Sequence, residues 1–130
     1  MADPIVYVEQ RIAAAFATIG GAKAIGVDIA VRASDRADAQ VNGSIALAKA
    51  LGLTPRDVAT KVLEVAELSD ICSDAQVAGP GFINLTFQND FLARELLSSS
   101  VSEKLGVRNA AKSRKIVIDY SAPNVAKEMH

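Results

Sequence analysis

The sequence predicts an α+β fold, in which a small antiparallel or mixed sheet is covered by helices on one face. Two kinds of periodicity indicate this. Apolar residues recur at steps of three and four in residues 4–19, as on one face of a helix. In residues 82–87 they instead alternate with other residues, as in a half-buried strand. The expected order is helix, strand, two helices, two strands and helix, which is typical of an open α+β sandwich.

The first helix is expected over residues 4–19. Asp3 is a suitable N-cap, and the proline that follows it fits the first helical turn. The pair Gly20-Gly21 ends this helix. Three β-branched residues then alternate with other residues in 27–31, which predicts a half-buried strand.

Two short helices are expected in the middle of the chain. Residues 34–42 are polar and irregular, and we interpret them as a loop. Asn42 or Ser44 can cap a helix over residues 45–51. Thr54 can cap the next helix, because a proline at the first helical position and an acid in the first turn follow it.

A hairpin and a last helix are expected next. Residues 71–77 and 82–87 have strand patterns, and the Ala-Gly-Pro-Gly sequence between them is typical of a turn. Asn89 or Asp90 can cap the fourth helix. The side chains of Phe82, Asn84 and Thr86 should share one face of the second strand, whereas Ile83, Leu85 and Phe87 should face the core.

The composition excludes several classes of protein. The chain has 130 residues and a net charge of −1, which fits one domain and argues against coating nucleic acid by bulk positive charge. A single cysteine permits no internal disulfide and no cysteine-based metal site, and the one histidine is the last residue. No apolar run is long enough for a membrane helix, and no signal peptide is evident. We therefore expect a cytoplasmic protein with no membrane partner.

The last part of the chain has a different character. Five basic residues and no acid lie between residues 104 and 118, and this run is either a solvated linker or a contact for phosphates. The β-branched run Ile-Val-Ile in residues 116–120 is typical of a strand buried on both faces. Too few residues follow for a crossover to a parallel neighbour. We interpret this strand as the first of a domain that continues beyond the chain.

Two sets of residues carry a resemblance to a known family. Residues 116–130, IVIDYSAPNVAKEMH, resemble the segment that opens the catalytic domain of bacterial-type arginyl-tRNA synthetases, where it runs on into His-Val-Gly-His. Residues 1–109 resemble the N-terminal additional domain of that family. The landmarks there are Asp38-x-Gln40-x-Asn42-Gly43 and Gly79-Pro80-Gly81-Phe82-Ile83-Asn84.

This resemblance implies an N-terminal fragment with two units. Residues 1–109 would be the additional domain that recognises the tRNA D-loop. Residues 110–130 would be a linker and the first strand of an incomplete class I catalytic domain with a Rossmann-like fold. The parent would attach arginine to tRNA(Arg) with ATP and Mg²⁺, whereas the fragment should be inactive and need no cofactor or metal.

The resemblance also assigns residues to the substrates of the parent. Asp119, Ser121 and Asn124 lie where the family holds arginine. Lys127 and His130 lie on the ATP side, where a cation and a hydrogen-bond donor can meet phosphate oxygens. Each of these residues could instead be a strand end, a turn residue or a solvated side chain.

For the tRNA, the resemblance points to Phe82 and Asn84, which match the aromatic and amide positions used to read the base at position 20. Stacking and amide contacts are how proteins read unstacked bases of RNA loops. Gln40 and Asn42 are further candidates, although Asn42 could be only a helix cap. Phe82 could also be a core residue. Relatives commonly carry an aromatic residue where this chain has Ala39, so stacking by that side chain is absent here.

Two alternatives and one weaker candidate remain. The chain could be a non-enzymatic α+β domain for protein interaction or a small ligand. The apolar strand at 116–120 could pair between two chains and form a dimer. Arg36 and the basic run could contact RNA phosphates.

Overall fold

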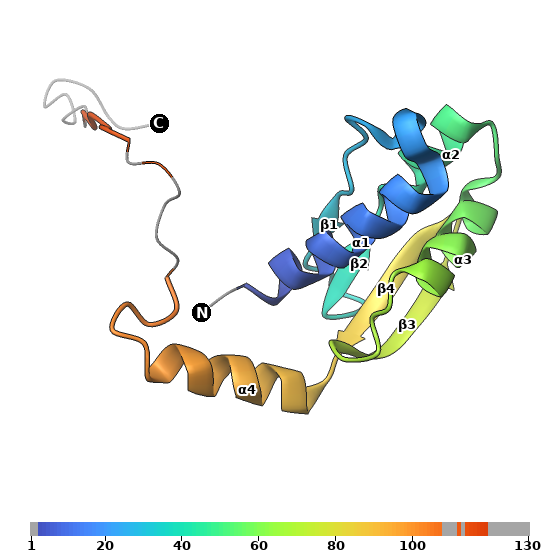
Figure 1. The fold of residues 1–130 in the computed structure, drawn as a ribbon. Coiled ribbons are helices and arrows are strands. Elements are labelled where there is room, and N and C mark those ends of the chain that lie inside the picture. The colour runs from blue at the N-terminus through green and yellow to red at the C-terminus, as the bar shows by residue number, and fades with distance from the viewer. Residues whose placement is uncertain (1–2, 108–111, 113, 120–130) are drawn as a thin grey trace, which may run out of the picture.

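The computed structural model describes residues 3–107, 112 and 114–119. A four-stranded antiparallel sheet, with strand order β1-β2-β4-β3, forms one layer (Figure 1). Helices α1 and α3 lie across one face of this sheet, and α2 packs against α3. The predicted α+β class, with a sheet covered by helices on one face, is therefore confirmed.

Helix α1 spans Pro4–Gly20. As predicted, Asp3 is the N-cap, and its carboxylate accepts a hydrogen bond of 3.0 Å from the backbone N–H of Ile5. Gly21 follows the helix with a φ of 51°, and the short 3₁₀ helix η1 runs over Gly21–Ala24. The buried face of α1 supplies part of the core, namely Val8, Ile12, Ala15 and Phe16.

Strand β1 is much shorter than the sequence suggested. It comprises only Val31–Arg32, whereas the prediction was 27–31. Ala30 has a φ of 51°, which places it in the left-handed region and bends the chain out of a strand. Two isolated bonds still tie this segment to the chain before α2: Asn42 N–H to the Ala30 carbonyl, 3.1 Å, and Gly43 N–H to the Ile29 carbonyl, 2.9 Å.

Strand β2, Ala39–Val41, lies in the segment that we interpreted as a loop. It is an inner strand of the sheet, because it pairs with β1 on one side and with β4 on the other. The side chains of Ala39 and Val41 are fully buried, so the burial of these two residues and the hydrogen bonds of both neighbours hold the strand in place.

Helices α2 and α3 span Ser44–Leu51 and Pro55–Val65. The expected cap of α2 is wrong: the N-cap is Gly43, and neither neighbouring polar side chain makes a capping hydrogen bond. The expected cap of α3 is confirmed, because the hydroxyl of Thr54 accepts a bond of 3.3 Å from the N–H of Asp57.

The hairpin is formed by β3, Cys72–Ala78, and β4, Phe82–Phe87. Its pairing runs from Cys72 opposite Phe87 to Ala78 opposite Phe82. The predicted faces are confirmed. Ile83 and Leu85 are 0% exposed in the core, whereas Phe82 and Asn84 are only half-buried on the opposite face.

Helix α4, Asn89–Ser100, leaves the end of β4. Its N-cap is Gln88 rather than Asn89 or Asp90, because the helix begins one residue earlier than expected. Phe91 anchors its first half with an edge-to-face contact to Tyr7 at 5.5 Å between ring centroids. None of the helices in the described part of the chain has the length and apolar content needed to cross a membrane.

The predicted strand at 116–120 is wrong for its described part, because residues 114–119 form neither helix nor strand. Ile116, Val117 and Ile118 are 73%, 89% and 67% exposed. A strand is stable only with a hydrogen-bonded neighbour and a surface to cover it, and the described residues supply neither to this segment. Pairing of the segment between two chains remains a prediction.

Candidate functional site

One polar row crosses the sheet on the face that α1 and α3 leave uncovered. Cross-strand pairing places Arg32, Gln40, Asn84 and Gln76 side by side, one from each strand. Residues paired in this way point to the same face. The side-chain N–H of Gln40 donates a 2.7 Å hydrogen bond to the Oδ1 of Asn84. The structure thus brings together two of the predicted RNA-binding residues.

A hollow of about 320 Å³ opens beside this row. Its lining combines an aromatic ring, an amide and polar groups of the loop before β2: Phe82, Gln40, Ser34, Asp35 and Arg36. A flat ring next to hydrogen-bonding groups suits a planar ligand with polar edges, such as an unstacked nucleobase. Ser34 and Asp35 were not predicted for the site, because only the pairing of β2 with β4 brings their loop to Phe82.

The turn before β4 determines where the Phe82 ring lies. Gly81 packs so closely on α3 that a Cβ on it would lie 2.7 Å from the Cβ of Pro55. Its φ of 148° is also unsuited to other residues. The guanidinium of Arg56 donates a hydrogen bond of 3.1 Å to the Gly79 carbonyl. The turn is therefore attached to the start of α3, and the side chain that follows it is directed to the open face.

The landmark from Asp38 to Gly43 has a structural explanation. The Asp38 carboxylate accepts a 2.8 Å hydrogen bond from the N–H of Phe87, which holds the end of β4. Gly43 lies against the backbone of residues 28–29, where no Cβ fits. Asn42 does not line the hollow, and its Oδ1 is buried without a partner among the described residues. Of the candidate RNA contacts, Asn42 is therefore the one that the geometry supports least.

Most of the residues assigned to arginine and ATP lie outside the residues that the structure describes. Ser121, Asn124, Lys127 and His130 lie outside the described residues. Asp119 is described and exposed, in a segment without helix or strand. Within the described ranges, no group of three or more His, Cys, Asp or Glu side chains is placed to hold a metal ion.

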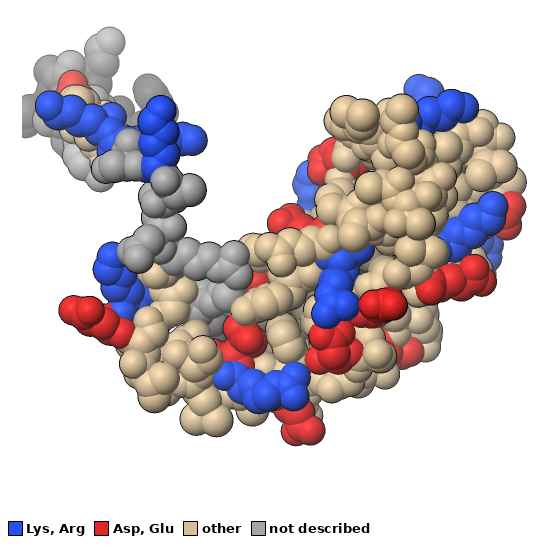
Figure 2. Space-filling model, viewed as in Figure 1, with Lys and Arg blue, Asp and Glu red and all other residues tan. Residues whose placement is uncertain are grey.

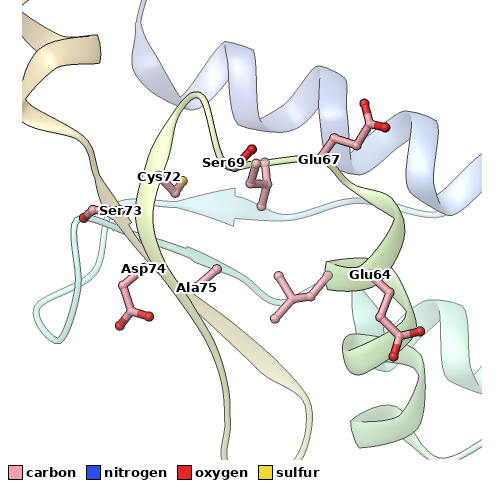
Figure 3. Close-up of a pocket in the computed structure, with 9 residues that line it drawn as sticks. Glu64, Glu67, Ser69, Cys72, Ser73, Asp74 and Ala75 are labelled. Atoms are coloured by element: carbon pink, nitrogen blue, oxygen red, sulfur yellow. The ribbon is translucent and has the colours of Figure 1, made fainter.

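A second hollow, of about 390 Å³, lies between the end of α3 and the start of β3 (Figure 3). Three carboxylates line it, those of Glu64, Glu67 and Asp74, and no basic residue does. The negative charge repels phosphate groups, so this hollow is unsuited to RNA. Cys72 also lines it, but its side chain is only 6% exposed.

The thiol of Cys72 should be unreactive in the folded chain. Burial, with smaller effects of the nearby charges of Asp70 and Asp38, raises its pKa from 9.0 to about 11. Because only the thiolate reacts with iodoacetamide, we expect alkylation at pH 8 to be about 100-fold slower in the folded protein than in urea. Mass spectrometry against time measures this, and equal rates in both states would contradict it.

The charges on the visible face in Figure 2 are mixed. Lysine and arginine side chains are interspersed with aspartate and glutamate over the helices, and no broad basic field is present there. Such a field is the usual sign of a surface that binds nucleic acid through charge alone. The face seen in Figure 2 therefore carries no such sign.

Comparison with known protein families shows the family to which this chain belongs. Residues 95–130 match the family described as tRNA synthetases class I (R), catalytic domain. Residues 7–87 match the family described as Arginyl tRNA synthetase N terminal domain, which is more than half of the chain. The chain belongs to the arginyl-tRNA synthetase family.

Relatives agree with this assignment. The arginine–tRNA ligase of Thermobifida fusca is 45% identical over 130 residues, which is 100% of this chain and 22% of the relative. That of Aliivibrio salmonicida is 49% identical over 108 residues, 81% of this chain and 18% of the relative. That of Citrobacter koseri is 52% identical over 93 residues, which is 72% of this chain and 16% of the relative. The chain thus spans about a fifth of the length of these relatives.

Proposed function

We propose that this chain is the part of an arginine–tRNA ligase that recognises tRNA(Arg) through a base of the D-loop. The observation that carries the proposal is the hollow on the uncovered sheet face, which Phe82 and Gln40 both line and beside which Gln40 is hydrogen-bonded to Asn84. Family membership sets aside the alternative of an unrelated interaction or small-ligand domain.

The side chains divide the work of base recognition. Phe82 supplies a flat ring on which an unstacked base can stack. Because a Gln40 N–H donates to the Oδ1 of Asn84, the NH₂ group of Asn84 and the Oε1 of Gln40 remain available. The pair therefore offers one donor group and one acceptor to the edge of a base. That arrangement can make two hydrogen bonds to a base such as adenine.

For the whole protein we propose ATP-dependent attachment of arginine to tRNA(Arg) in the cytoplasm, where translation uses the product. By resemblance, Asp119, Ser121 and Asn124 would bind arginine, and Lys127 and His130 would lie on the ATP and Mg²⁺ side. We also propose the division into a tRNA-recognition unit, 1–109, and a linker with the first catalytic segment, 110–130. By itself the chain would bind tRNA without aminoacylating it.

The proposal is tested by equilibrium binding of tRNA(Arg) and of the same tRNA with the base at position 20 replaced. We expect weak binding that falls with rising salt, because phosphate contacts contribute, and a preference for the unaltered tRNA. A preference of about 5- to 150-fold corresponds to the 1–3 kcal/mol of one mismatched base. Equal affinity for both tRNAs would contradict base recognition, and failure to bind either would contradict the proposed function as a whole.

A further inference from the structure

We propose that Arg32 and Arg36 bind the phosphate backbone of the RNA strand whose base occupies the hollow beside Phe82. This inference rests on the proposed function and extends it. It assigns two residues to positioning the strand, as distinct from the residues that read the base. In protein–RNA and protein–DNA contacts, phosphate contacts fix register and orientation, whereas base contacts provide specificity.

Both arginines flank Gln40. Arg36 lines the hollow together with Gln40 and Phe82. Arg32 is the direct partner of Gln40 in the pairing of β1 with β2, so its side chain leaves the sheet on the same uncovered face. Both residues are exposed. A base seated on Phe82 would therefore have two guanidinium groups beside its own nucleotide and the next one.

Both guanidinium groups are without a partner among the described residues. Within the described part of the chain, Arg32 and Arg36 make no ion pair and no side-chain hydrogen bond. Arg11 shows the contrast, because its guanidinium lies 2.8 Å from the carboxylate of Asp70. Arg56 is likewise occupied, by the Gly79 carbonyl. The two arginines beside the hollow can thus donate all their N–H groups to a ligand.

The hollow and its border also differ in charge. Asp35 lines the hollow together with Arg36, so the hollow itself is close to neutral and suits an uncharged base. Arg32 places a second guanidinium at the border of the hollow, beside Gln40. A guanidinium forms two parallel hydrogen bonds with phosphate oxygens, which makes arginine the side chain best suited to hold this border to an RNA backbone.

The test compares Arg32→Gln and Arg36→Gln in the full chain, with Lys61→Gln as the control. Lys61 is an exposed cation on α3, which covers the opposite face of the sheet. Binding of tRNA(Arg) and of the tRNA altered at position 20 is measured at several salt concentrations. Each arginine variant should bind both tRNAs several-fold more weakly by the same factor, so the preference between them is retained. The slope of log K against log salt should become shallower by about 0.7 for each arginine removed.

The outcomes separate this inference from the proposed function. Arginine variants with the affinity and salt slope of Lys61→Gln would overturn the inference, while a retained preference for the unaltered tRNA would leave the function in place. A variant that loses the preference with an unchanged slope would also overturn it, because that residue would be reading the base. Absence of any preference in the unmodified chain would instead overturn the proposed function. Circular dichroism of each variant confirms that the fold is kept.

Discussion

Replacing Phe82 with alanine is expected to weaken binding of tRNA(Arg) by about 5- to 150-fold. Stacking of one base on an aromatic side chain contributes about 1–3 kcal/mol, and 1.4 kcal/mol is tenfold in affinity. Phe82 is half-buried on the uncovered face, and among the residues that line the hollow it is the aromatic one, so its removal takes away the ring on which a base can stack. The preference between tRNA(Arg) and the tRNA altered at position 20 should disappear at the same time, as measured by fluorescence anisotropy.

Thr86→Ala is the matched control, because Thr86 lies on the same strand and the same face and is exposed. It should bind both tRNAs as the unmodified chain does. Phe82→Tyr should keep most of the affinity, since the ring is retained. Equal binding by Phe82→Ala and Thr86→Ala would show that Phe82 is only a packing residue.

Replacing Gly43 with alanine is expected to destabilise the fold by about 3 kcal/mol, because the added methyl group has no room. A Cβ at this position would lie 2.7 Å from the carbonyl carbon of Ile29 and closer still to the carbonyl oxygens of residues 28 and 29. Relief of this clash would break the 2.9 Å hydrogen bond from Gly43 N–H to Ile29. The start of α2 would then separate from the segment before β1. Urea unfolding followed by circular dichroism measures the change.

Gly26→Ala separates this steric effect from the general cost of replacing a glycine. Gly26 has a φ of 79°, but nothing lies within 4 Å of the Cβ that would be added. The expected cost is only about 1 kcal/mol, from the left-handed backbone. If the two variants unfolded at the same urea concentration, the close approach at Gly43 would not matter for stability. Binding of tRNA should follow the folded fraction in both variants.

Part of the site could be read from local patterns. The two-residue repeat of 82–87 correctly placed Phe82 and Asn84 on one face and Ile83 on the other, because a strand alternates regardless of what it pairs with. The Gly-Pro-Gly before it correctly indicated a turn. The pattern does not show why the second glycine is needed. The reason is the close contact of Gly81 with Pro55 at the start of α3.

The strand β2 shows why the rest could not be predicted. Ala39-Gln40-Val41 is too short to give a periodic signal, and polar residues precede it. It is a strand because β1 and β4 pair with it on both sides. The reverse case is Ile116-Val117-Ile118, whose residues favour a strand but which have no partner strand among the described residues. Residues with a strand propensity form a strand only where a neighbouring strand is available to pair with them.

The sequence by itself determined the α+β class, the helices, the hairpin and the shared face of Phe82 and Asn84. These depend on periodicity and on capping residues, whose effects act over a few neighbouring positions. Only the tertiary structure decided that Gln40 lies against Asn84, that Arg36 lines a hollow with Phe82, and that Arg32 lies beside Gln40 in the sheet. Gln40 and Asn84, like Arg36 and Phe82, are more than 40 positions apart in the chain, and the pairing of β2 with β4 brings them together.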